Sequence, residues 1–79
     1  MNELKYRTHR IKCDQPFFQN VKSGRKKFEI RKDDRDYQVG DTLILYYDQD
    51  EIYMVITYKT TYEQKEGYCV LGIEPEDNL

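Results

Sequence analysis

The chain is poor in the residues that build metal centres, membrane spans or export signals. Its 79 residues include only two cysteines and one histidine. Cys13 and Cys69 form no C-x-x-C pair, and His9 cannot complete a four-ligand zinc set with them, so we predict no metal site. The sequence has no run of about eighteen apolar residues that could cross a membrane. Its polar N-terminus lacks the apolar stretch of a signal peptide. We therefore expect a cytosolic protein.

In a reducing compartment, the two cysteines are expected to be free and buried. A disulfide between the first and last strands is the less favoured alternative. The short length leaves room for one small domain, which we place at residues 1–74, followed by a disordered acidic tail at 75–79. We expect no cofactor.

Long helical patterns are also absent, which argues against a parallel sheet with helical crossovers. Alternating or β-branched residues predict five main strands, at 4–12, 26–32, 42–48, 52–62 and 68–74. A short helix is expected at 15–23, with Asp14 as its N-cap, Phe17 and Phe18 plugging the end of a sheet, and Gly24 as its stop. Tyr37 and Val39 are expected to enter the core from an irregular link.

These elements predict a mostly β fold, namely a small, largely antiparallel barrel of five or six strands. Closing the sheet would protect its edges, and the helix would cover one opening.

Charge is distributed unevenly along the chain, although its net value is only −2. Residues 1–35 contain eleven Lys and Arg and five Asp and Glu, whereas residues 36–79 contain two Lys and ten Asp and Glu. The halves therefore carry +6 and −8. Such polarity could attract an anion locally, or the two halves could interleave and neutralise each other through cross-strand pairs.

The most informative segment is 24–41, because it combines many cations with alternating apolar residues. Within residues 27–31 the period is two, so Phe28 and Ile30 are predicted to anchor the strand in the core. The opposite face would then present Lys27, Glu29 and Arg31. For Lys27 and Lys32 we favour the interpretation that they solubilise the strand and pair with the acids of the following turn, namely Asp33, Asp34 and Asp36.

Gly24, Lys26, Glu29 and Arg31 have the spacing G-x-K-x-x-E-x-R, which resembles the signature of the ASCH domain superfamily. Residues 9–12, H-R-I-K, and 33–41, D-D-R-D-Y-Q-V-G-D, resemble further pieces of a small bacterial and phage branch of that superfamily. The resemblance covers about His9 to Val70 and implies a PUA-like fold. It also implies RNA or nucleotide binding, because PUA-like and ASCH domains are generally regarded as such modules.

The first hypothesis is therefore a binding module for RNA or a nucleotide. Lys26, Glu29 and Arg31 would converge in a cleft, with the cations holding phosphate and Glu29 accepting from a base edge or sugar hydroxyl. Single-stranded or structured RNA fits better than duplex DNA, because the predicted helix is too short for a major groove. Further candidate contacts are Lys12, Arg35 and His9, with Tyr6, Tyr46 and Tyr53 as stacking surfaces. Arg35 could instead pin its turn, and His9 could instead be a packed, hydrogen-bonded residue.

The second hypothesis is an enzyme acting on a modified nucleoside, with Lys26 and Glu29 as the catalytic pair. The favoured alternative is that Lys26 and Glu29 form an ion pair that lines a cleft, and Arg31 could also pair directly with Glu29. Some ASCH-like amidohydrolases act on acetylated cytidine with a lysine, a threonine and a downstream glutamate. Lys26 matches that lysine, but Glu29 stands in the threonine's place, which argues against this hydrolysis. Glu74 is the available downstream acid.

The third hypothesis is a protein-interaction module that uses its acidic second half against a basic partner. Under all three hypotheses we expect a monomer that does not bind membranes.

Overall fold

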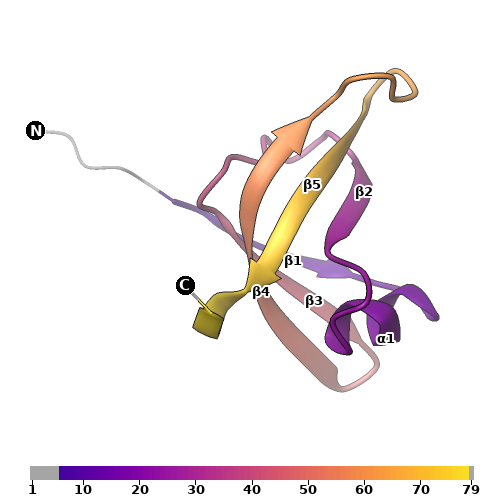
Figure 1. The fold of residues 1–79 in the computed structure, drawn as a ribbon, viewed down its shortest axis with the longest axis vertical. Helices are drawn as coiled ribbons and strands as arrows, with labels where there is room; N and C mark the ends of the chain where they lie inside the picture. The colour runs from indigo at the N-terminus through magenta and orange to yellow at the C-terminus, as the bar shows by residue number, and fades with distance from the viewer. Residues whose placement is uncertain (1–5, 79) are drawn as a thin grey trace, which may run out of the picture.

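Five strands form one strongly curled sheet with the order β1-β3-β4-β5-β2, giving a half-barrel (Figure 1). The computed structural model describes residues 6–78. Its elements are β1 (Thr8–Lys12), α1 (Phe17–Lys22), β2 (Phe28–Lys32), β3 (Thr42–Tyr47), β4 (Asp50–Thr60), β5 (Tyr68–Pro75) and the 3-10 helix η1 (Glu76–Asn78).

The predicted mostly β class with one short helix is confirmed, and the sheet is largely antiparallel. Only the β1–β3 pair is parallel, whereas β3–β4, β4–β5 and β5–β2 are antiparallel. Within residues 6–78 the sheet does not close into a complete barrel, because β1 pairs only with β3 and β2 pairs only with β5. The edges of β1 and β2 are therefore the two ends of the half-barrel.

The concave face of the sheet holds the core. Inward positions alternate with outward ones along each strand, as the pleat requires. The fully buried aliphatic side chains come from three neighbouring strands and are Leu43, Leu45, Ile56, Leu71 and Ile73. Both cysteines are also buried and free, as the sequence predicts. Burial raises the pKa of the Cys69 thiol, which keeps this thiol protonated at neutral pH.

The helix α1 covers the open end of the half-barrel, near the end of β1 and the β3–β4 hairpin (Figure 1). Phe18 is buried, as predicted, but Phe17 is exposed, so only one of the two phenylalanines plugs the sheet. The Asp14 side chain does not cap the helix, because the N-cap is Pro16. Gln15 Oε1 instead accepts a 3.1 Å hydrogen bond from the first-turn N–H of Gln19. Gly24, with φ of +88°, follows the helix as the predicted stop.

The link between β2 and β3 is tied to β1 by a buried carboxylate. Asp41 accepts hydrogen bonds from the backbone N–H groups of Arg7 and Gln38, each at 3.0 Å, and from His9 Nε2 at 2.8 Å. Tyr37 packs edge-on against His9 and is buried, as predicted, whereas Val39 is exposed, contrary to expectation. The hydrogen bonds to Asp41 therefore fix the position of β1 relative to the start of β3.

The Asp41 carboxylate makes the fold sensitive to acid. Burial alone would raise the pKa of Asp41, but the hydrogen bonds from Arg7, His9 and Gln38 outweigh it and hold the pKa below its ordinary value of 3.8. The unfolded chain therefore takes up this proton first as the pH falls, and stability is lost as the pH drops below about 4. Chemical denaturation at a series of acidic pH values should show this loss. In Asp41→Asn, which cannot titrate, the free energy of unfolding should fall less steeply as the pH falls. An equal dependence on pH in the variant and the wild type would contradict this role of Asp41.

The C-terminal segment differs from the expected disordered tail, since Glu76–Asn78 form η1. Pro75, Glu76 and Asp77 line a pocket with Tyr53 and Met54 of β4, so this segment lies against the sheet. Leu79 is outside the described residues. No helix within residues 6–78 has the length and apolar character needed to span a membrane.

Candidate functional site

The strand β2 presents its faces in the opposite sense to the prediction. Glu29 is only 3% exposed, whereas Phe28 and Ile30 are 42% and 54% exposed. Cross-strand pairing explains this, because Glu29 lies opposite Leu71 and Arg31 lies opposite Cys69, both of which face the core. At this edge the concave side ends in a polar cluster and not in packed apolar groups.

The cluster consists of one buried carboxylate held between two cations. Lys26 Nζ lies 2.6 Å from Glu29 Oε1, and the Arg31 guanidinium reaches Glu29 Oε2 at 2.9 Å from Nη2 and 3.0 Å from Nε. Burying Glu29 alone would be costly, and these paired, charge-assisted hydrogen bonds offset that cost. The apolar alternation therefore predicts the wrong buried face of β2, because the adjacent cations stabilise a buried glutamate.

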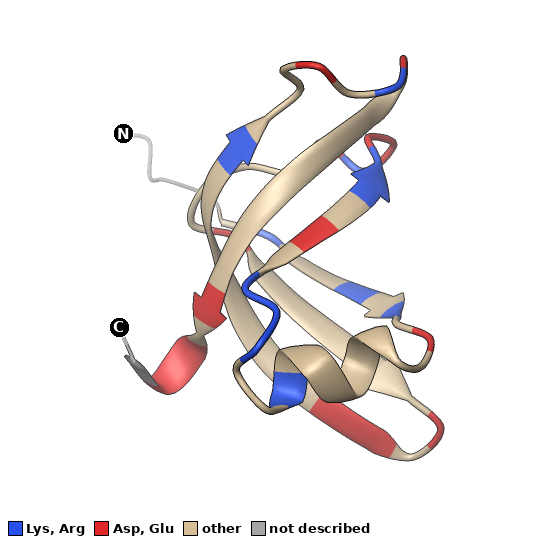
Figure 2. Ribbon diagram, turned by 45° about the vertical axis from the view of Figure 1, so that its right-hand side comes forward, with Lys and Arg blue, Asp and Glu red and all other residues tan. Residues whose placement is uncertain are grey.

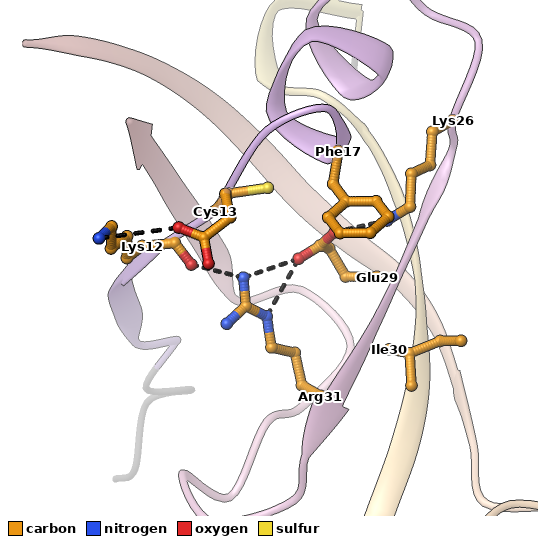
Figure 3. A pocket seen from close by; sticks show the side chains of 8 residues that line it. Lys12, Cys13, Phe17, Lys26, Glu29, Ile30 and Arg31 are labelled. Atoms are coloured by element: carbon orange, nitrogen blue, oxygen red, sulfur yellow. Dashed lines mark hydrogen bonds and ion pairs between the residues drawn. The ribbon is translucent and has the colours of Figure 1, made fainter. Parts of the chain in front are cut away.

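The same cluster spans the two open edges of the sheet. Arg31 Nη2 donates a 2.7 Å hydrogen bond to the backbone carbonyl of Lys12 in β1 (Figure 3). We call the region between the β1 and β2 edges, crossed by this bond, the seam. Lys26 is fixed from a second side, because its Nζ also donates to the Phe28 carbonyl at 2.7 Å.

A pocket of about 320 Å³ opens at the seam, and we call it the Glu29 pocket. Its lining comes from the end of β1, from α1 and from β2, namely Lys12, Cys13, Asp14, Phe17, Lys26, Glu29, Ile30 and Arg31. This volume is at the lower end of the range for small-molecule sites. The predicted convergence of Lys26, Glu29 and Arg31 in one hollow is therefore present (Figure 3).

Glu29 forms the expected ion pair with Lys26 and also pairs with Arg31. Its Oε1 accepts from Lys26 and its Oε2 accepts from Arg31, so the carboxylate orients both cations. Lys26 and Arg31 are 16% and 25% exposed at their side chains, so both reach the pocket opening. Arg31 Nη1 makes no hydrogen bond within the described part of the chain, which leaves its two N–H groups available to a ligand.

The aromatic wall of the pocket is Phe17, which the sequence reasoning assigned to the core. Its ring is half exposed and lies 5.7 Å from Lys26 Nζ. Of the predicted stacking tyrosines, Tyr46 is covered by Arg10, whose guanidinium carbon sits 4.0 Å from the ring centroid. Tyr6 and Tyr53 are exposed but do not line this pocket.

Cys13 lines the pocket as a protonated thiol. Burial, reinforced by the nearby Glu29 carboxylate, raises the pKa of Cys13 despite the opposing influence of Arg31 and Lys26. A thiol with a raised pKa is a poor nucleophile at neutral pH. Cys13 therefore contributes shape and apolar surface.

The remaining predicted residues divide between the seam and the core. Lys12 lines the Glu29 pocket, and Arg35 lies in a neighbouring pocket. His9 does not line the seam: its side chain is buried against Asp41 and Tyr37, which corrects its assignment as a cleft residue. Among residues 6–78, no three His, Cys, Asp or Glu side chains gather as possible metal ligands.

Lys27 and Lys32 are exposed, as expected of cations that solubilise a strand, but within the described residues they do not form the expected ion pairs with the turn acids. Asp33 pairs with Lys59 at 3.0 Å, and Asp36 lies 3.8 Å from Arg7. Figure 2 shows Lys and Arg around β2 and at the end of β1, whereas acids are prominent at the β3–β4 hairpin and in η1. Ion pairs also join the two halves of the chain, namely Arg7–Asp36, Arg10–Glu51 and Lys22–Asp50, so folding neutralises part of the charge asymmetry.

A family model described as "Domain of unknown function (DUF3850)" matches residues 8–73, which is most of the chain. A similar protein is the "Uncharacterized 12.9 kDa protein in GpA 3'region" of Escherichia phage P2. It is 47% identical over 38 residues, which are 48% of this chain and 35% of that protein. The match thus spans about a third of the length of this relative.

Proposed function

We propose that this chain, which belongs to the DUF3850 family, binds a nucleotide or single-stranded RNA in the seam. The observation that carries the proposal is the orientation of Lys26 and Arg31 by one buried carboxylate at the mouth of the Glu29 pocket. Two cations and one acid leave a local charge of +1. Such a site attracts an anion while its donors are already fixed in direction.

The mixed lining favours a nucleotide over a bare inorganic anion. Phe17 offers an exposed aromatic ring, on which a base could stack, beside the donors of Lys26 and Arg31. Base–aromatic stacking contributes about 1–3 kcal/mol per base. The resemblance of the G-x-K-x-x-E-x-R spacing to the ASCH signature supports the same ligand class.

Binding is favoured over hydrolysis by the pocket chemistry. The lining residues include no serine or threonine hydroxyl, Cys13 is protonated, and both Glu29 oxygens are occupied. The Lys26–Glu29 contact is the one feature that favours an amidohydrolase instead. Formation of product from acylated nucleosides, lost in Lys26→Ala, would establish that alternative.

Fluorescence anisotropy with labelled single-stranded RNA at several salt concentrations tests the proposal. The logarithm of the association constant should fall with the logarithm of the salt concentration, with a slope of about 0.7 for each phosphate contacted. Lys26→Ala should weaken binding by about tenfold, because it removes one charged donor. Lys65→Ala, an exposed lysine in the β4–β5 turn, is the matched control and should bind normally. Undetectable binding at low salt, or equal affinity in the two variants, would contradict the proposal.

A further inference from the structure

We infer that the ligand of the seam is a single-stranded polynucleotide that spans two adjacent pockets, with its phosphates concentrated in the second. This inference rests on the proposed function and specifies its ligand class. A second pocket, which we call the Arg35 pocket, has a volume of about 340 Å³. It is lined by residues of β1, β2, β3 and the link after β2.

The Arg35 pocket is lined by more basic side chains than the Glu29 pocket. Five basic side chains line it against the single acid Asp34, namely Arg10, Lys12, Arg31, Lys32 and Arg35. Lys32 and Arg35 form no ion pair within residues 6–78. The other three cations are each paired with an acid that does not line this pocket: Arg10 with Glu51, Lys12 with Asp14 and Arg31 with Glu29. Lys32 and Arg35 therefore supply the excess of positive charge over Asp34 that is available to phosphates.

The two pockets are adjacent and share two lining residues. Lys12 and Arg31 line both of them, and the 2.7 Å bond from Arg31 Nη2 to the Lys12 carbonyl joins the two strands at this point. In Figure 3 the Arg31 guanidinium lies between Lys12 and Glu29. A strand bound along the seam would pass Arg31 when going from one pocket to the other.

The chemistry of the pockets differs in a way that matches the parts of a nucleotide chain. The Glu29 pocket combines an exposed ring, Phe17, and the aliphatic Ile30 with a charge cluster whose members largely satisfy each other. The Arg35 pocket offers charge, while its partly buried aromatic ring, Tyr46, is already covered by Arg10. A base fits the first pocket, and backbone phosphates fit the second.

Polynucleotide binding across both pockets predicts a dependence on ligand length. A single nucleotide fills only one pocket, whereas a longer strand gains the additional cations without new ordering of the protein. Lys32 and Arg35 are exposed, and their side chains make no hydrogen bond within the described residues, so replacing them should leave the fold intact.

The experiment compares uridine monophosphate with oligouridylates of increasing length on the wild type, on Lys32→Ala/Arg35→Ala and on Lys26→Ala. Affinity for the wild type should rise with length, and the double variant should bind the longest oligomer at least about tenfold more weakly, with a salt slope lower by about 1.4. The gain with length should largely disappear in this variant. Lys65→Ala is the control for nonspecific loss of charge, and thermal unfolding checks each fold.

The outcomes separate the inference from the proposed function. If monophosphate and oligomers bind equally, and Lys26→Ala weakens both while the double variant weakens neither, the inference is wrong and the proposed function stands. If no ligand binds at low salt, both fail. If a sulfated oligosaccharide of matched charge binds as tightly as the oligomer, the seam is a general polyanion surface and the inference is overturned.

Discussion

Asp41→Ala is expected to cost more stability than any other single replacement considered for this chain. The change removes a buried acceptor from two backbone N–H groups and from His9 Nε2. Leaving such buried partners unsatisfied costs about 3–5 kcal/mol. A domain of this length has a total stability of roughly 4–12 kcal/mol, so the loss takes a large share of it.

Differential scanning calorimetry measures this effect directly. The midpoint of unfolding should fall by at least about 12 °C, given about 4–8 °C for each kcal/mol in a domain of this size. Asp77→Ala is the matched control, because Asp77 is exposed in η1, and its change should stay within about 0.5 kcal/mol. If Asp41→Ala and Asp77→Ala have the same unfolding midpoint, the hydrogen bonds of the Asp41 carboxylate between β1 and the β2–β3 link do not stabilise this part of the fold.

Replacement of Arg31 is expected to have the largest effect on ligand binding. Arg31 contacts Glu29 with two nitrogens and Lys12 with one of them, and it lines both seam pockets. Arg31→Lys keeps the charge but supplies one ammonium nitrogen in place of a planar guanidinium. One nitrogen cannot bond Glu29 and the Lys12 carbonyl of β1 and still bind a ligand through two parallel N–H groups. We expect RNA affinity to fall by about tenfold in Arg31→Lys and by up to about a hundredfold in Arg31→Ala.

Arg25→Lys is the matched control for this prediction, since Arg25 is exposed and lines neither seam pocket. Thermal melts must accompany the titrations, because Arg31→Ala also leaves buried Glu29 with one cation in place of two. Unchanged affinity in a folded Arg31→Lys would mean that charge alone, and not the geometry of the guanidinium, is used at the seam.

Local sequence patterns predict the strands well and the orientation of β2 badly. The strands expected at 42–48, 52–62 and 68–74 match β3, β4 and β5 closely, because β-branched and aromatic residues dominate there. In β2, alternation alone places Phe28 and Ile30 inside. The structure reverses this face because β2 is an edge strand whose buried carboxylate is neutralised by neighbours at i−3 and i+2.

The polar cluster at the seam could be predicted only in part. The spacing of Lys26, Glu29 and Arg31 indicates that they meet, and they do. The seam itself depends on the sheet remaining open and on the long-range bond from Arg31 to Lys12, which no local pattern encodes. For the same reason, local spacing predicts Phe17 in the core, whereas it lines the pocket. For His9 the sequence leaves a packed and a cleft-lining role open, and its contacts with Asp41 and Tyr37 show the packed one.

Chemical-shift mapping by NMR with a panel of nucleotides and short single-stranded RNAs tests the central claim most directly. A seam ligand should shift the amide signals of Cys13, Phe17, Lys26, Ile30 and Arg31, and longer strands should add Lys32 and Arg35. Signals of Tyr58 and Tyr62, on exposed parts of β4 and the following turn, should stay in place. Shifts confined to those two residues, or none with any nucleotide, would contradict the account.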